Sequence, residues 1–101
     1  MDRSDLIRPQ GERLAALADF FRVFADETRI RILYALLDGE KRVLDIAAEL
    51  DISHSAVSHQ LQLLRARRLV SFRREGKSIR YSIADEHIHS ILRQGIEHLG
   101  E

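Results

Sequence analysis

Apolar residues recur at helical spacing in four successive stretches of the first two thirds of the chain. The stretches that this spacing predicts to be amphipathic helices are residues 10–25, 26–37, 43–50 and 54–67. Asp26 and Ser53 stand where N-cap residues belong, and Gly39 is expected to end the second helix. Only the turn 51–53 separates the last two helices, and this arrangement is the helix-turn-helix pattern.

Two strands follow these helices. Residues 70–74 and 78–83 alternate apolar and polar side chains, which is typical of β-strands. Glu75-Gly76-Lys77 joins them, and Gly76 suits a turn because glycine adopts positive φ without strain. A hairpin directly after a helix-turn-helix predicts a winged helix-turn-helix. The expected fold class is therefore mainly α (α+β), with a two-stranded β-hairpin as the wing.

The C-terminal stretch predicts a further amphipathic helix, with leucine or isoleucine at positions 88, 91, 92, 96 and 99. Asp85 is its expected N-cap. His87 and His98 are eleven residues apart, close to three helical turns, so they share a face but are separated by roughly 16 Å. His98 and Glu101 are neighbours on the helix surface. The helix therefore carries two metal-ligand types at each end, and no single ion reaches both ends.

Two copies of this helix, paired antiparallel across a two-fold axis, would bring the two ends together. Asp85 and His87 of one chain would then meet His98 and Glu101 of the other, twice per dimer, and two nitrogen and two oxygen ligands suit tetrahedral Zn(II). His89 is a candidate fifth ligand, and a higher ligand number would favour Co(II) or Ni(II). The alternative, equally open on chemistry alone, is that Asp85 only caps the helix and the other side chains are solvated.

Composition limits the remaining function classes. The chain has 101 residues, of which 45% are hydrophobic, and this is enough for one small domain with a core. The absence of cysteine excludes disulfides, thiolate metal sites and cysteine nucleophiles, and it favours a reducing compartment. The N-terminus lacks the long apolar run of a signal peptide or a membrane span. We expect a cytoplasmic protein without a membrane partner.

A formal net charge of zero conceals a strong asymmetry along the chain. Residues 53–82 contain seven Lys and Arg against one Asp or Glu, a net charge of +6, whereas residues 1–52 and 83–101 each carry −3. A basic segment that coincides with a helix-turn-helix and a wing indicates double-stranded DNA as the partner. We expect residues 1–9 to be a flexible N-terminal tail and residues 10–101 to be one DNA-binding and dimerisation domain.

The expected DNA contacts lie on the helix that begins at residue 54 and on the wing. Serine, histidine and glutamine side chains suit base edges in the major groove, and arginine and lysine suit phosphates. The residues predicted to contact DNA are His54, Ser55, Ser58, His59, Gln60, Arg65, Arg73, Arg74 and Lys77. A solvated face with helix caps is the competing interpretation, and it accounts poorly for the coincidence of charge and motif.

The sequence contains no constellation for catalysis. Ser58 and His59 are adjacent on a helix and point about 100° apart, so they do not form a nucleophile–base pair. A glycine-rich phosphate-binding loop is also missing from the sequence. We therefore expect a protein that is not an enzyme.

Three segments together resemble the ArsR/SmtB family of metal-responsive repressors. Residues 24–33, Phe-Ala-Asp-Glu-Thr-Arg-Ile-Arg-Ile-Leu, are similar to the family's second-helix signature, with Glu27 where a proline is usual. Residues 53–61 resemble its recognition helix, and residues 69–77 resemble its wing. A second site class of the family has Cys-x-Cys on the third helix. Residues 42–46 contain no cysteine, so the resemblance implies no thiolate sensing of arsenic, cadmium or lead.

The zinc-sensing branch of this family carries its ligands on the last helix as Asp-x-His, ten residues, then His-x-x-Glu or His-x-x-His. Asp85, His87, His98 and Glu101 match this spacing. The resemblance implies a homodimer formed by the first and last helices, whose metal-free form represses a gene for metal efflux or sequestration and whose Zn(II)-bound form releases the operator. The alternatives are a DNA-binding regulator without a ligand, or one that responds to Co(II), Ni(II) or a partner protein.

Overall fold

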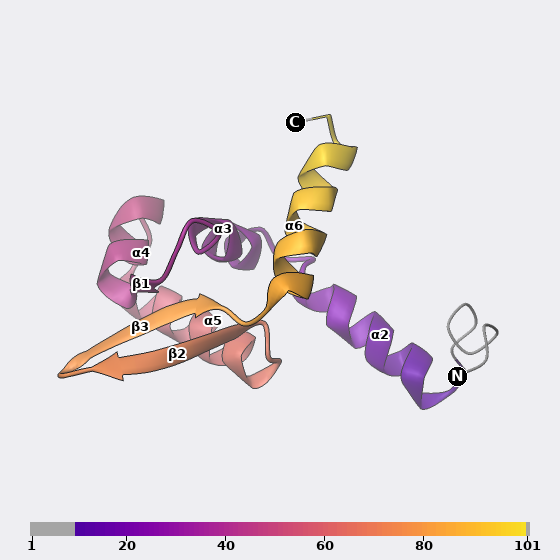
Figure 1. Ribbon diagram of the computed structural model, residues 1–101, viewed down its shortest axis with the longest axis horizontal. Coiled ribbons are helices and arrows are strands. Elements are labelled where there is room, and N and C mark those ends of the chain that lie inside the picture. The colour runs from indigo at the N-terminus through magenta and orange to yellow at the C-terminus, as the bar shows by residue number, and fades with distance from the viewer. Residues whose placement is uncertain (1–9, 101) are drawn as a thin grey trace.

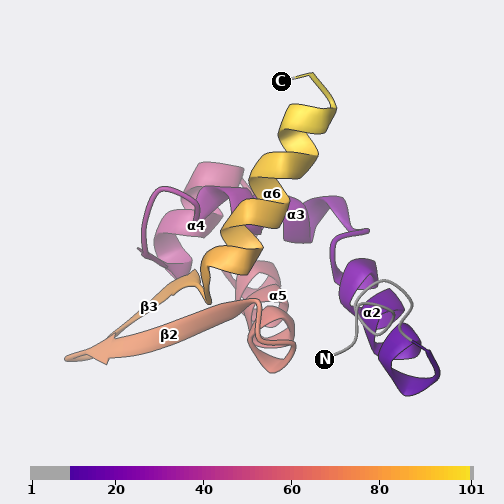
Figure 2. The same ribbon diagram turned by 45° about the vertical axis from the view of Figure 1, so that its right-hand side comes forward.

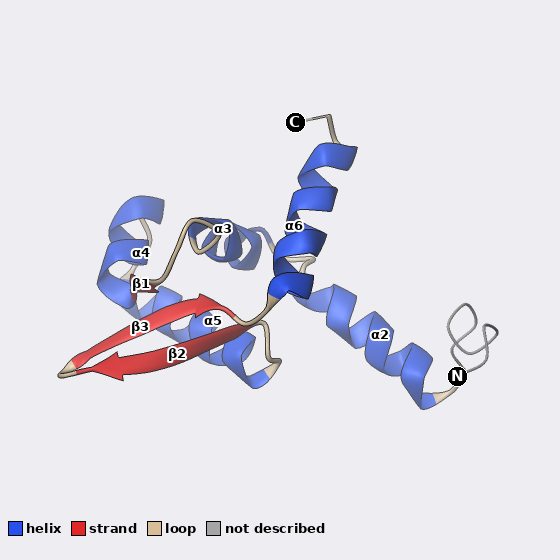
Figure 3. Cartoon of the chain, in the orientation of Figure 1, coloured by secondary structure: helices blue, strands red, loops and turns tan. Residues whose placement is uncertain are grey.

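The computed structural model describes residues 10–100, so the expected N-terminal tail and Glu101 lie outside the described residues. Figures 1 and 3 show the order of the elements, which are α2 (Glu12–Val23), α3 (Glu27–Ala35), β1 (Lys41–Arg42), α4 (Val43–Leu50), α5 (His54–Ala66), β2 (Val70–Glu75), β3 (Ser78–Ile83) and α6 (Glu86–His98). Helix-turn-helix followed by hairpin is confirmed, and α4 and α5 form the helix-turn-helix. No helix in residues 10–100 has the length and apolar character needed to cross a membrane.

The core lies where α3, α4 and α5 meet the sheet and the beginning of α6. Its largest fully buried side chains are Ile32, Leu33, Leu36, Ile46, Val57, Leu61, Leu64 and Leu69. The expected caps are formed, because the side chain of Asp26 accepts a hydrogen bond from the backbone N–H of Arg29 at 2.9 Å. The side chain of Ser53 likewise accepts from the N–H of Ala56 at 3.1 Å. These caps fix where α3 and α5 begin.

The predicted two-stranded wing is confirmed as β2 and β3, and the sheet contains one further strand. β2 and β3 pair antiparallel with Arg73 opposite Arg80, and Gly76 occupies the turn with φ of 64°. A third strand, β1, pairs antiparallel with the other edge of β3, so the strand order is β1-β3-β2. The prediction missed β1 because a strand of two residues is too short to show alternation.

Helices α2 and α6 project from this compact part of the chain (Figures 1 and 2). Val23 is the one buried residue of α2, whereas Phe21 is 53% exposed. In α6, Ile88 and Leu92 enter the core, but Leu99, directly after the helix, is 77% exposed. Both helices therefore carry apolar side chains that their own chain leaves in contact with solvent.

Candidate nucleic-acid interface and metal-ligand residues

Helix α5 has one buried face and a mostly polar remainder. Val57, Leu61 and Leu64 are fully buried, as expected from their helical spacing. Of the predicted DNA-contacting residues of α5, the exposed ones are His54, Ser55, His59 and Arg65, and the half-buried ones are Ser58 and Gln60. The structure therefore leaves most of this predicted set accessible to a ligand.

The side chain of Gln60 forms a hydrogen bond with another helix of the same chain. Its Oε1 accepts a hydrogen bond from Nε of Arg29 at 3.0 Å, in a part-buried contact between α5 and α3. Arg29 itself belongs to the helix whose N-cap, Asp26, accepts from its backbone N–H. Helical periodicity did not reveal this contact, because the two residues are 31 positions apart in the sequence.

The basic side chains of the wing differ in their surroundings, because Arg73 forms ion pairs whereas Arg74 and Lys77 are exposed. The guanidinium of Arg73 donates from Nε to Oε2 of Glu40 at 2.9 Å and lies 2.7 Å, through Nη1, from Oε2 of Glu75. This hydrogen bond from Arg73 lowers the pKa of the Glu40 carboxyl group. Arg74 and Lys77 are exposed near the turn at Gly76. The predicted phosphate contacts of the wing therefore include one arginine whose charge is offset by two carboxylates.

Arg65 connects α5 to the wing. Its guanidinium carbon lies 4.0 Å from the centroid of the Phe72 ring in β2, a cation–π contact. Phe72 is itself half-buried against the core. The sequence placed Arg65 among the DNA contacts, and the structure adds a packing role between helix and wing.

The predicted metal ligands at the start of α6 lie together. Oδ1 of Asp85 accepts hydrogen bonds from the backbone N–H groups of His87 at 2.8 Å and of Ile88 at 3.4 Å, which is the expected cap. Nδ1 of His87 lies 3.3 Å from the same oxygen. The His87 side chain is 92% exposed and that of Asp85 is 54% exposed, so both are accessible to an ion. His89 is half-buried.

The other predicted ligands lie at the opposite end of α6. His98 is the last residue of the helix and is exposed. Within residues 10–100, no three side chains of the His, Cys, Asp or Glu types come close enough together to hold one metal ion. Within the described residues, one chain thus presents the Asp85–His87 pair at the start of α6 and His98 at its end.

An apolar groove runs along the exposed side of α6 and was not predicted as a feature of one chain. It is lined by residues of α2, α3 and α6 together with Phe24, which follows α2, and Leu99, which follows α6. The lining residues within the helices are Phe21, Ile30, Tyr34, Ile91, Leu92, Gly95 and Ile96. The hydroxyl group of Tyr34 donates a hydrogen bond to the backbone carbonyl of Leu92 and so fixes α6 against α3. Burial raises the pKa of this hydroxyl group.

Comparison with known proteins identifies the family. The model of the bacterial regulatory proteins of the arsR family matches residues 26–71, from the N-cap of α3 into β2. The chain is 46% identical over 85 residues to a "Transcriptional repressor SmtB homolog" of Synechocystis sp., across 84% of this chain and 64% of that protein. It is 36% identical over 86 residues to a "Cadmium resistance transcriptional regulatory protein CadC homolog" of Staphylococcus aureus, across 84% of this chain and 71% of that protein.

The structure is also similar to a solved one. The homodimeric winged helix-turn-helix DNA-binding domain Mb0332 from Mycobacterium bovis, described as a possible ArsR-family regulator, matches with a TM-score of 0.80 and 29% identity. That match covers 100% of this chain and 88% of the other. Together with the winged helix-turn-helix and its basic segment, these matches show that the chain belongs to the arsR family of bacterial transcriptional regulators, DNA-binding proteins that are not enzymes.

Proposed function

We propose that the protein is a metal-responsive repressor whose metal-free homodimer binds operator DNA and whose zinc-bound homodimer releases it. The proposed site joins Asp85 and His87 of one protomer to His98 and Glu101 of the partner subunit. The observation that carries the proposal is the separation of ligand types on α6, with the Asp85–His87 pair at its start and an exposed histidine at its end. Relatives named for cadmium resistance and as an SmtB homolog support a metal effector.

The apolar groove along α6 supports the homodimer. It contains Phe21, Ile96 and Leu99, three large apolar side chains that one chain leaves exposed. Apart from its own helix, no described part of the chain would lie within 4 Å of a Cβ atom at Gly95. Glycine in a helix costs about 1 kcal/mol relative to alanine, and a second helix that approaches closely would account for it. The homodimeric M. bovis domain has the same fold.

The chemistry of the side chains fits Zn(II). Two imidazole nitrogens and two carboxylates form a donor set that zinc accepts in tetrahedral geometry. Capping occupies Oδ1 of Asp85, and Oδ2 remains as the second carboxylate oxygen of that side chain. The same cap orients His87, because its N–H and its Nδ1 both face the Asp85 carboxylate. Capping and ligation are therefore compatible in one residue.

Zinc and operator binding would be coupled through the dimer. If zinc lowers the affinity for the operator, the operator lowers the affinity for zinc by the same factor, and the coupling free energy is about 1–3 kcal/mol in typical cases. In the proposed dimer α6 contributes both to the metal sites and to the interface, so a change in how two α6 helices pair alters the distance between the two α5 helices. Half-site spacing on DNA is sensitive to that distance.

Bound zinc per protomer, measured after dialysis against a weak chelator, tests the proposal. We expect about one tight zinc in the natural chain, and its loss in both His87→Ala and His98→Ala. His59→Ala, which alters an exposed histidine of α5, is the matched control and should keep its zinc. His89→Ala separates four ligands from five, because a Co(II) or Ni(II) site that uses His89 would be weakened and a four-ligand zinc site would not.

Release of DNA is the second part of the test. Zinc should weaken operator binding by the natural chain and leave binding by His87→Ala and His98→Ala unchanged. Zinc binding that is indifferent to both substitutions would contradict the site. Tight operator binding without any metal effect would support the alternative, a regulator that responds to no metal or to a partner protein.

A further inference from the structure

Three sides of helix α5 are already in contact with the rest of the chain. The first is the buried face formed by Val57, Leu61 and Leu64. The second faces the wing, where the guanidinium of Arg65 lies over the Phe72 ring. Side chains on these two sides are committed to the fold of the monomer.

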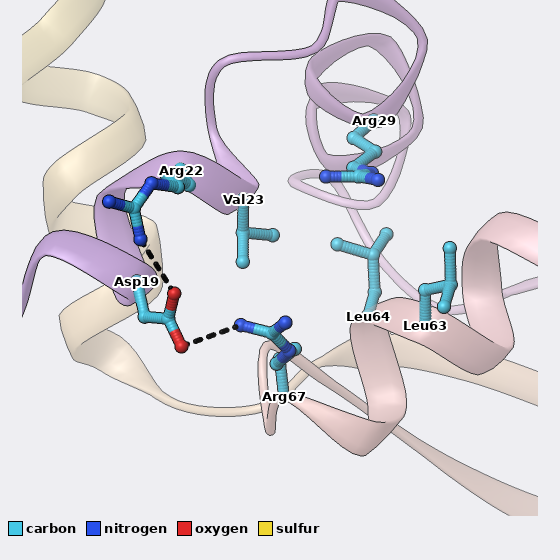
Figure 4. Close-up of a pocket in the computed structure, with 7 residues that line it drawn as sticks. All are labelled: Asp19, Arg22, Val23, Arg29, Leu63, Leu64 and Arg67. Carbon is cyan, nitrogen blue, oxygen red and sulfur yellow. Dashed lines mark hydrogen bonds and ion pairs between the residues drawn. The ribbon is translucent and has the colours of Figure 1, made fainter. Parts of the chain in front are cut away.

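The third side borders a cleft between α2, α3 and α5 (Figure 4). At this cleft Nε of Arg29 donates to Oε1 of Gln60 at 3.0 Å, and Nη1 of Arg67, directly after α5, lies 3.7 Å from Oδ2 of Asp19 in α2. Figure 4 shows Arg29 and Arg67 on opposite walls of the cleft, with the Asp19–Arg67 ion pair drawn. Gln60 and Arg67 are seven residues apart, two helical turns, so they share this side of the helix.

The fourth side of α5 is exposed. Successive residues of an α-helix are rotated by roughly 100°, and positions i, i+4 and i+7 therefore share one face. Ser55, His59 and Gln62 have this spacing, lie opposite the buried face and are all exposed. Gln62 was not among the residues predicted to contact DNA, whereas Gln60 was.

We propose that Gln62, and not Gln60, reads base edges of the operator, and that Gln60 is a positioning residue through which Arg29 fixes the rotation of α5. The proposal rests on the DNA binding of the proposed function. A glutamine side chain recognises adenine in the major groove with its amide nitrogen and oxygen together, at N7 and N6. In Gln60 that oxygen is directed at Arg29, while Gln62 is exposed on the side of α5 opposite the buried face.

The test compares Gln62→Met with Gln60→Met. Methionine has nearly the same length and helix propensity as glutamine, so the pair differs in position and not in chemistry. Operators are first selected from a random duplex library by the natural metal-free chain, and base preferences are then measured for each variant. Thermal unfolding of both variants gives a readout of the structural role.

We expect Gln62→Met to bind the selected operator about tenfold to a hundredfold more weakly, the loss of one bidentate base contact. For Gln62→Met, replacement of the adenine that Gln62 would contact should cause no further loss of operator affinity. Gln60→Met should keep every base preference and unfold at a lower temperature, because the guanidinium of Arg29 loses its partner.

Three results would overturn the proposal: natural affinity and preference in Gln62→Met, a uniform loss over all sequences in that variant, or an altered base preference in Gln60→Met. If the natural chain enriches no sequence, operator binding itself fails and the proposal fails with it. Enrichment by the natural chain followed by any of the three results leaves operator binding intact and rejects only the role of Gln62.

Discussion

The DNA-binding core, formed by α3, α4 and α5, buries most of its apolar side chains, whereas the projecting helices α2 and α6 leave several of theirs exposed. In α3, α4 and α5 most large apolar side chains meet one another, with Leu44 and Leu63 as exposed exceptions, and Leu64 is completely shielded from solvent. In α2 and directly after α6, comparable side chains such as Phe21 and Leu99 remain more than half exposed. The first region can be folded by a single chain, whereas the second acquires its burial from a second copy in the proposed dimer.

The largest expected effect separates the two regions by stability. Leu64→Ala removes a fully buried side chain from α5, and such truncations lower the free energy of unfolding by about 2–5 kcal/mol. Chemical denaturation should show this loss at every protein concentration. A loss that disappears at high concentration would mean that dimerisation, and not the core of one chain, holds α5 in place.

The second effect concerns association. Phe21→Glu introduces a charge into the apolar groove, and by two-fold symmetry it does so twice per dimer. We expect the dimer dissociation constant to rise about a hundredfold or more, because two aromatic side chains lose their burial. Sedimentation equilibrium measures the change.

A matched control uses an apolar residue that is equally exposed but lies elsewhere. Leu44 in α4 is 60% exposed and does not line the groove. Leu44→Glu should leave the dimer dissociation constant within about twofold of the natural value, because Leu44 is not among the residues that line the groove. Equal weakening by Leu44→Glu and Phe21→Glu would show that the groove is not the dimer interface.

Sequence reasoning succeeded where short-range pattern decides the structure. The cap at Ser53, the inner face of α5 from Val57 to Leu64, and the turn at Gly76 are fixed by neighbours within a few residues. The same reasoning identified the helix that Asp85 caps. These features have a local physical cause, and a local pattern predicts them.

Contacts between distant residues were not predictable in this way. The Arg29–Gln60 hydrogen bond and the Arg73–Glu40 ion pair each join side chains more than thirty positions apart. Their formation depends on how helices and strands pack, which periodicity does not report. The proposed metal site depends in addition on a second chain, and within residues 10–100 no three side chains of ligand type come together.

A smaller effect separates the two roles of Asp85. Asparagine caps a helix as well as aspartate does, whereas alanine does not cap and costs about 1 kcal/mol. Asp85→Asn should therefore unfold like the natural chain but bind zinc more weakly, since a neutral amide is a poorer zinc ligand than a carboxylate. Asp85→Ala should lose both properties. Thermal unfolding and competition with a chelator measure the two roles, and natural zinc affinity in Asp85→Asn would remove Asp85 from the site.

The smallest expected effect lies on the wing. The hydrogen bond from Arg73 lowers the pKa of Glu40, so the ion pair contributes fully above the unfolded-state pKa and is lost as the pH falls through the lowered folded-state value. At neutral pH the Glu40–Arg73 ion pair is therefore intact. The substitution Glu40→Gln removes this ion pair without a change of pH.

Glu40→Gln should raise the affinity for DNA a few-fold at low salt and increase the salt dependence by up to about one released ion, because Arg73 then has only Glu75 as an ion-pair partner and its guanidinium is more available to a phosphate. Fluorescence anisotropy at several salt concentrations measures both quantities. Glu12→Gln, in the first turn of α2, changes the net charge equally but lies on a projecting helix. An equal increase in DNA affinity in Glu12→Gln would mean that the affinity depends on the total charge of the protein and not on the ion pair of Arg73. The DNA-binding core and the projecting helices would then not differ in their electrostatic contribution to DNA binding.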